Sequence, residues 1–120
     1  YSAVDTFEAM YQRQRHQRTV ERLFEDIDLL LTPTTGTTYT IEAVAEAPHE
    51  TNATLGHYTN YVNLLDLSAV AVPAGTRPDG APLVVTFVAP ADDDSTALSF
   101  ADRFVPDSPS PKTARTSTAE

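Results

Sequence analysis

Hydrophobic positions along the chain recur first at helical spacing, in residues 3–26. Ser2, followed three residues later by Asp5, forms a plausible capping pair at the start of this stretch. The middle of the stretch, residues 12–19, is polar and rich in arginine. A helix with apolar ends and a cationic middle either pairs with acidic neighbours or lines a site.

Two short apolar runs that end in proline predict strands. The first is residues 29–31, ahead of Pro33, and the second is residues 69–72, ahead of Pro73. Continuous apolar runs of this length are typical of strands buried on both faces, as in a parallel sheet. Because proline cannot donate to a strand ladder, we expect the first strand to end at Pro33. The loop over residues 34–40 would then lie at the edge where open α/β sheets bind ligands.

Two more helices are expected between these strands. Thr40 can cap a short helix over residues 41–47, which Pro48 ends. A second long helix is predicted over residues 50–65, with its apolar side chains on one side.

The C-terminal half adds a hairpin and a helix. Turn-forming residues at 77–80 precede an apolar run at 83–88, which indicates a hairpin-like return of the chain. Asp94 or Ser95 then caps a last helix that runs to about Phe104. The order of elements predicts an α/β fold with a mixed sheet flanked by helices. Since so few strands make a poor sheet, we expect neighbouring strands to come from elsewhere.

The chain divides into an incomplete domain portion at residues 1–104 and a tail at 105–120. The tail is rich in Pro, Ser, Thr and Ala, and it has too little apolar content to pack, so we expect it to be disordered. The sequence begins at Tyr1, without an initiator methionine or a signal-like region. We therefore expect a truncated product.

Charge and composition exclude several classes of partner. The formal net charge of −9 argues against nucleic acid and against an anionic membrane, since both require cationic contacts. No apolar stretch approaches the roughly 20 residues that cross a bilayer. The chain has no cysteine, which excludes disulfide and thiolate chemistry and is compatible with the cytoplasm, where we expect the protein.

The inventory of catalytic side chains is thin. His16, His49 and His57 belong to no recognisable nucleophile–base motif, and we expect all three to be structural or solvated. The acidic run at residues 92–94 fits the N-terminus of a helix better than a metal site. We expect neither a metal nor another cofactor.

Five segments carry a family resemblance. They are the Ser-Ala-Val-Asp-Thr-Phe start at 2–7, the Thr-Thr-Tyr-Thr-Ile loop at 37–41, the Tyr-Thr-Asn-rich helix at 58–67, the Val-Pro-Ala-Gly element at 72–75 and the Asp-Gly-Ala-Pro turn at 79–82. Over residues 2–104 the chain resembles the C-terminal third of amidase-signature hydrolases. It is most similar to the allophanate hydrolase branch, because generic amidases share the proline element without the preceding helix.

The resemblance implies a parent enzyme that hydrolyses allophanate (urea-1-carboxylate), completing urea degradation to ammonia and carbon dioxide. Enzymes of this family use a serine nucleophile, a second serine in a cis peptide, and a lysine. This chain holds no Gly-Gly-Ser-Ser-Gly-like segment, and its single lysine is Lys112. We therefore expect a hydrolase fragment that contains no catalytic residue, is inactive alone and needs the remainder of the amidase fold.

The resemblance also implies two substrate-binding residues, Tyr11 and Arg18, which would hold the substrate carboxylate. They are two helical turns apart, so both can face one pocket, and a guanidinium fork on a carboxylate is the expected geometry. The alternative is a core tyrosine and a solvent-exposed arginine. The sequence departs from the family's usual glycine at Val84 and from its usual Leu- and Ala-rich helix at residues 12–16.

Two other functions stay open. One is a general amidase acting on another small amide. The other is a non-catalytic subunit that completes a separate amidase chain. The sequence also leaves the oligomeric state open, a homodimer included.

Overall fold

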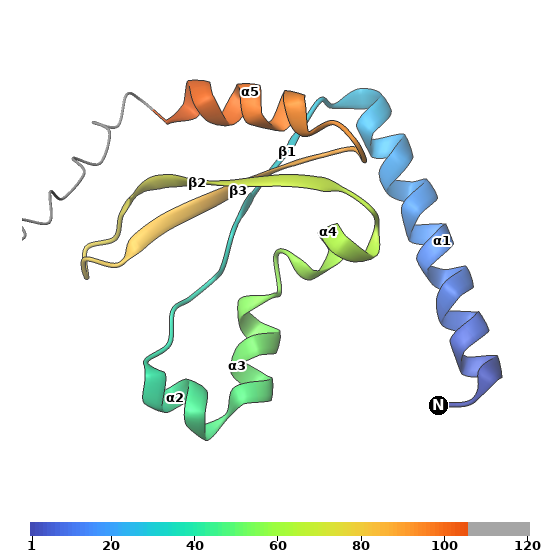
Figure 1. The fold of residues 1–120 in the computed structure, drawn as a ribbon, viewed down its shortest axis with the longest axis horizontal. Coiled ribbons are helices and arrows are strands. Elements are labelled where there is room, and N and C mark those ends of the chain that lie inside the picture. Colours follow the sequence, from blue (N-terminus) through green and yellow to red (C-terminus); the bar gives the residue numbers. More distant parts are fainter. Residues whose placement is uncertain (106–120) are drawn as a thin grey trace, which may run out of the picture.

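The alternation of helical and strand-like stretches produces an α/β fold, as expected (Figure 1). The computed structural model describes residues 1–105. Its elements are α1 (Ala3–Asp26), β1 (Leu30–Pro33), α2 (Ile41–Glu46), α3 (Pro48–Leu55), α4 (Asn60–Leu64), β2 (Ser68–Thr76), β3 (Pro82–Ala89) and α5 (Asp94–Phe104). The tail expected to be disordered is residues 105–120. Of these, residues 106–120 lie outside the described residues. The division of the chain at residue 104 stays a prediction.

The three strands form one sheet in the order β1-β3-β2, and both neighbouring pairs are antiparallel. A turn closed by the Arg77 amide donating to the Ala81 carbonyl, at 2.8 Å, joins β2 to β3, which confirms the hairpin. Gly80 supplies the positive φ of 84° that this turn needs.

The expectation that residues 29–31 and residues 69–72 form strands buried on both faces is wrong. In β2, Ala69 and Ala71 are exposed and alternate with the less exposed Val70 and Val72. β1 begins at Leu30, lies on the outer side of β3 and alternates half-buried with exposed residues. Its antiparallel register, in which Leu30 faces Val88 across the pair, leaves Leu31 exposed. Since β3 is the only strand that pairs with β1 within residues 1–105, no described strand pairs with its outer edge.

The core forms where α5 packs on one face of the sheet (Figure 1). Val72 of β2, Phe87 of β3 and Ala101 of α5 are its buried centre. Phe104 meets Phe87 edge to face, with ring centroids 5.4 Å apart and planes at 76°. This geometry is favourable for aromatic rings and fixes the end of α5 against the central strand.

The single helix expected over residues 50–65 is wrong, because the structure breaks it into α3 and α4. Gly56 ends α3, and the backbone turns before α4 starts at Asn60. A Cβ at Gly56 would meet the end of the Asn60 side chain, which would have to move to make room for it. The break places Tyr58 against Gly36, in the loop after β1.

Side-chain caps explain where α1 and α2 begin. The Ser2 hydroxyl accepts from the Asp5 amide at 3.2 Å, and the Asp5 carboxylate accepts from the Ser2 amide at 2.6 Å. This reciprocal pair confirms the expected capping box. The hydrogen bond from the Ser2 backbone amide lowers the pKa of the Asp5 carboxyl, and the Ser2 hydroxyl lowers it further by a smaller amount. Thr40 caps α2 as expected, by accepting from the Ala43 amide.

The expected cap of the last helix is wrong by one residue. Asp93 precedes α5 and makes no side-chain capping bond, while Asp94 is already the first helical residue. Asp92, one position earlier, has a positive φ of 62°, and the Asp93 amide donates to the Pro90 carbonyl at 3.3 Å. A backbone turn, rather than a side-chain cap, therefore sets the start of α5.

The long helix α1 extends away from the sheet (Figure 1). It has 24 residues, and none of them is buried. Within residues 1–105, no helix is both long enough and apolar enough to cross a membrane.

Candidate functional site

The two expected substrate-binding residues, Tyr11 and Arg18, lie on α1. Both side chains are exposed, with Tyr11 57% accessible. Seven residues bring a helix back to nearly the same direction, so the two side chains share one face, with a rise of roughly 10 Å between their Cα atoms. Neither lines the cavities of about 340, 660 and 280 Å³ that lie among residues 1–105. The structure thus places both on one open face without enclosing them in a pocket.

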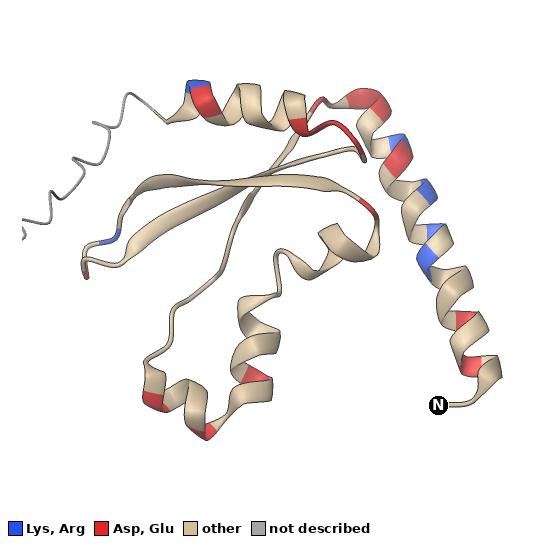
Figure 2. Cartoon of the chain, in the orientation of Figure 1, with Lys and Arg blue, Asp and Glu red and all other residues tan. Residues whose placement is uncertain are grey.

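Other arginines belong to the same cationic part of α1. Figure 2 shows the basic residues gathered in the middle of the helix, between acidic residues at either end. Arg15 and Arg22 follow Tyr11 and Arg18 by four residues each, so they extend the same helical face. Within residues 1–105, the ion pair formed is between Arg77 and Asp79, and none involves α1. The arginines of α1 therefore form no ion pairs with acidic residues in the described part of the chain.

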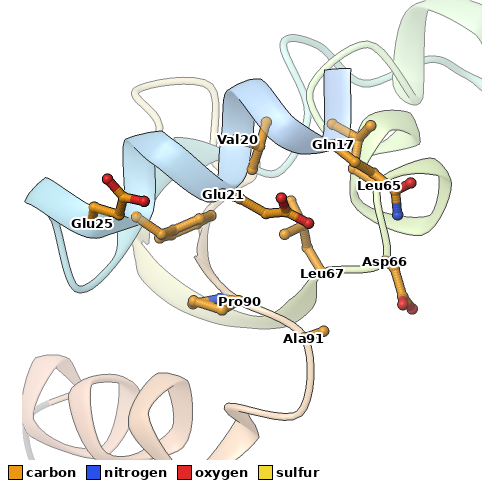
Figure 3. A pocket seen from close by; sticks show the side chains of 10 residues that line it. Gln17, Val20, Glu21, Glu25, Leu65, Asp66, Leu67, Pro90 and Ala91 are labelled. Atoms are coloured by element: carbon orange, nitrogen blue, oxygen red, sulfur yellow. The ribbon is translucent and has the colours of Figure 1, made fainter. Parts of the chain in front are cut away.

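A cavity of about 340 Å³ lies where the C-terminal half of α1 meets the connections after α4 and β3 (Figure 3). Glu21, Glu25 and Asp66 contribute carboxylates to its lining, whereas no lysine or arginine does. Phe24 and Leu67 supply part of its apolar wall. Because carboxylates repel an anion, this cavity does not suit a carboxylate substrate.

Asp66 lies in the left-handed region, with φ at 58°. It directly follows the C-cap of α4, and the next amide, of Leu67, donates back to the Val62 carbonyl at 3.0 Å. The Asp66 amide itself donates to the Asn63 carbonyl at 3.4 Å. These two bonds form a Schellman motif, in which glycine usually occupies the position of Asp66.

Sequence reasoning missed Tyr61 of α4. Its hydroxyl and the Thr32 hydroxyl of β1 are buried, and neither has a hydrogen-bond partner of standard geometry within residues 1–105. Burial raises the pKa of Tyr61, and the nearby Thr32 hydroxyl offsets part of that shift. Only the fold brings α4 and β1 together, so no local sequence pattern could have shown this pair.

The threonines after β1 form polar contacts at the end of the sheet. The Thr34 and Thr86 hydroxyls are 2.7 Å apart, and Thr86 is buried. The Thr35 hydroxyl donates to the Thr37 carbonyl at 2.9 Å. A small cavity of about 280 Å³ lies between this loop and the start of β3, near Arg77. Since Arg77 is already paired with Asp79 at 2.8 Å, its charge is compensated.

The histidines are all exposed, as expected of solvated residues. His57 stacks edge to face on Tyr58, with ring centroids 5.0 Å apart. Residues 1–105 contain no cluster of three or more potential metal ligands.

Comparisons with known proteins agree with this fold. The amidase family profile matches residues 1–98. The urea amidolyases of Lachancea kluyveri and Saccharomyces cerevisiae are each 43% identical over 104 residues, which is 87% of this chain. A putative amidase, AmiD, of Mycobacterium tuberculosis is 35% identical over 81 residues, or 64% of this chain.

A solved structure is also similar. The S177A allophanate hydrolase of Kluyveromyces lactis has a TM-score of 0.79 and 40% sequence identity over 87% of this chain. The chain spans only 17% of that protein and 6% of each urea amidolyase. The family match covers α1, the whole sheet and the start of α5, and on these grounds the chain belongs to the amidase family.

Proposed function

We propose that this chain supplies the carboxylate-binding helix of an amide-bond hydrolase that acts on allophanate and yields ammonia and carbon dioxide. The names of the similar proteins, urea amidolyase and allophanate hydrolase, support this substrate. The observation that carries the proposal is the shared exposed face of α1 with Tyr11 and Arg18. Both groups are free to meet a ligand, because no described residue forms an ion pair with the guanidinium of Arg18 and the Tyr11 side chain is exposed.

The chemistry of the two side chains fits a small carboxylate. Arg18 can donate two parallel hydrogen bonds to the two carboxylate oxygens, and the Tyr11 hydroxyl can donate a third. The row continued by Arg15 and Arg22 makes the middle of this face cationic, between Glu8 and Glu25, in a chain whose formal net charge is −9. Such a local reversal of charge attracts an anion to this face rather than to the acidic cavity beside it.

The reaction itself would depend on residues outside this chain. In amidase-signature enzymes the serine nucleophile, the cis-peptide serine and the lysine lie upstream of the region matched here. We infer that the 120 residues alone do not hydrolyse amides and that they act with the remainder of the amidase fold. We place the complete enzyme in the cytoplasm, with which the lack of cysteine is compatible. A homodimer is one candidate for its assembly.

The second candidate is a general amidase, which the match to the putative amidase AmiD favours. A general amidase has no need for a carboxylate clamp, so the arginine face separates the two. A non-catalytic subunit that completes a separate amidase chain is the remaining alternative. It requires the same contacts with the rest of the fold but a separate gene for this segment.

The test is the Arg18→Ala variant of the full-length protein, assayed for ammonia release from allophanate. Loss of a charged hydrogen bond should raise KM roughly 10- to 100-fold, since such bonds contribute about 1.5–3 kcal/mol. Arg18→Lys should recover only part of the loss, because lysine cannot form the fork. Arg103→Ala, on the exposed side of α5, is the matched control and should leave KM unchanged.

Arg15→Ala decides which arginine is involved, because Arg15 lies on the same face one turn closer to Tyr11. The proposal requires a smaller effect from Arg15→Ala than from Arg18→Ala. An unchanged KM in Arg18→Ala, in an enzyme that does hydrolyse allophanate, would refute the assignment of Arg18.

A further inference from the structure

The turn that joins β2 to β3 contains a dipeptide with chemistry of its own, Asp79-Gly80. It is the one Asp-Gly step in the sequence, which contains no Asn-Gly step. Both residues are exposed, at the end of the hairpin that points away from α1 (Figure 1). Exposed loop tips are the places where a folded chain is most open to covalent change, such as proteolytic nicking.

An aspartate that is followed by glycine can isomerise without an enzyme. The Gly80 backbone nitrogen bonds to Cγ of Asp79, the carboxylate takes up a proton, and one of its oxygens leaves as water with the amide proton. Water then opens the cyclic succinimide, and opening at the former Asp79 backbone carbonyl produces isoaspartate, in which the chain continues through the side chain. Glycine favours ring closure because it has no Cβ beside the attacking nitrogen and because its backbone is permissive.

In the folded hairpin, the groups that would react are already engaged in three bonds. One carboxylate oxygen of Asp79 accepts from the Arg77 guanidinium at 2.8 Å, and the other accepts from the Ala81 amide at 3.1 Å. The attacking group, the Gly80 amide, donates to the Arg77 carbonyl at 2.9 Å. Because the nitrogen gives up its proton and Cγ moves toward it, the ring cannot close until these bonds open.

We propose that Asp79 is a site of spontaneous isoaspartate formation and that the Arg77 side chain controls its rate. Of the three bonds, only the guanidinium bond is donated by a side chain, so it can be removed while the backbone of the turn is kept. The Arg77 and Asp79 side chains are 40% and 54% exposed. Since an exposed ion pair contributes little, its loss should raise the rate of isomerisation roughly two- to fivefold.

Isomerisation would change the shape of the turn. Isoaspartate adds a methylene to the backbone between Asp79 and Gly80, so the bond from the Arg77 amide to the Ala81 carbonyl, now 2.8 Å, cannot keep its geometry. Arg77 also lines the cavity of about 280 Å³ beside the loop after β1. The modification therefore alters both the hairpin and one wall of this cavity.

Ageing of the full-length protein at neutral pH, followed by peptide mapping, tests the proposal. Isoaspartate appears as a peptide of unchanged mass and altered retention, and fragment ions locate it. Arg77→Ala should form isoaspartate at residue 79 roughly two- to fivefold faster than the unsubstituted protein. Arg77→Lys should recover part of the protection, because an ammonium can still pair with the carboxylate. In urea all these proteins should react at the same rate, because the three bonds require the folded hairpin.

Two further variants serve as controls. Arg103→Ala removes an exposed arginine that forms no ion pair within residues 1–105, and it should leave the rate at residue 79 unchanged. Asp79→Glu should remove the signal, because the longer side chain cannot form a succinimide.

Two results would overturn the proposal. Equal rates for folded Arg77→Ala and the folded unsubstituted protein would show that Arg77 does not control the reaction. Isoaspartate formed mainly at another aspartate would show that Asp79 is not the site. Both results are independent of hydrolysis of allophanate, so a failure of the proposed function would leave this inference standing.

Discussion

Replacing Phe87 by alanine should strongly destabilise the sheet and α5 together. Phe87 is 7% exposed and lies at the centre of the core, between Val72 and Ala101. Phenylalanine-to-alanine changes in cores cost about 3–5 kcal/mol, which includes the energy of the cavity left behind. Phe104, the aromatic partner of Phe87, is 41% exposed, so water can reach one side of the new space. We therefore expect the free energy of unfolding to fall by about 3 kcal/mol, the lower end of this range.

The assay is urea unfolding of the amidase domain that contains these residues, followed by circular dichroism. The midpoint should fall while the slope with urea stays unchanged, which is the signature of a pure stability change. Leu98→Ala is the matched control, because Leu98 lies on the outer side of α5 and is 55% exposed. It should cost at most about 0.5 kcal/mol. A Phe87→Ala cost below about 1 kcal/mol, or one equal to that of the control, would refute this description of the core.

Two further predictions concern single residues. Asp66→Gly should stabilise the domain by about 0.5–1 kcal/mol in urea unfolding, because glycine removes the left-handed strain. The control Asp94→Gly, in the first turn of α5, should destabilise the domain. A loss of stability in Asp66→Gly would show that the aspartate makes a favourable contact. The pKa of Tyr61 is raised above its ordinary value of 10.0, so its contribution to stability is complete below that pH and is lost as the pH rises through the folded value. Titration of the phenolate absorbance should show one late tyrosine that Tyr61→Phe removes, and an unchanged titration in that variant would contradict the assignment.

Local sequence signals predicted several boundaries well. Ser2 and Asp5 fixed the start of α1 because their capping box needs only residues three apart. The turn at 77–80 specified the hairpin because its proline and glycine favour a single backbone path. Both features depend on neighbours in the chain, so the fold did not alter them.

Features that depend on distant residues could not be predicted. The helical pattern over 50–65 continues through Gly56, but the structure breaks there and packs Tyr58 against Gly36. The leucine run before Pro33 does not show that β3 would lie between β1 and β2. The same limit hid the buried hydroxyls of Thr32 and Tyr61.

The candidate site was predictable only in part. The spacing of Tyr11 and Arg18 gave their common face, which the helix retains. Whether that face encloses a ligand depends on which other residues pack against α1. The pattern of residues within α1 cannot show this. The cavity of about 660 Å³ between α1 and α4 shows the same dependence, since its lining is complete only when α4 is placed beside α1.

The most direct test of the proposed function is the substrate preference of the full-length protein. Ammonia release should be measured from allophanate and from simple amides of similar size that lack a carboxylate. We expect kcat/KM to favour allophanate by at least about 100-fold, because the arginine face gains charged hydrogen bonds only from a carboxylate. Turnover of the simple amides alone, or an equal kcat/KM for both kinds of substrate, would contradict the proposed function and favour a general amidase.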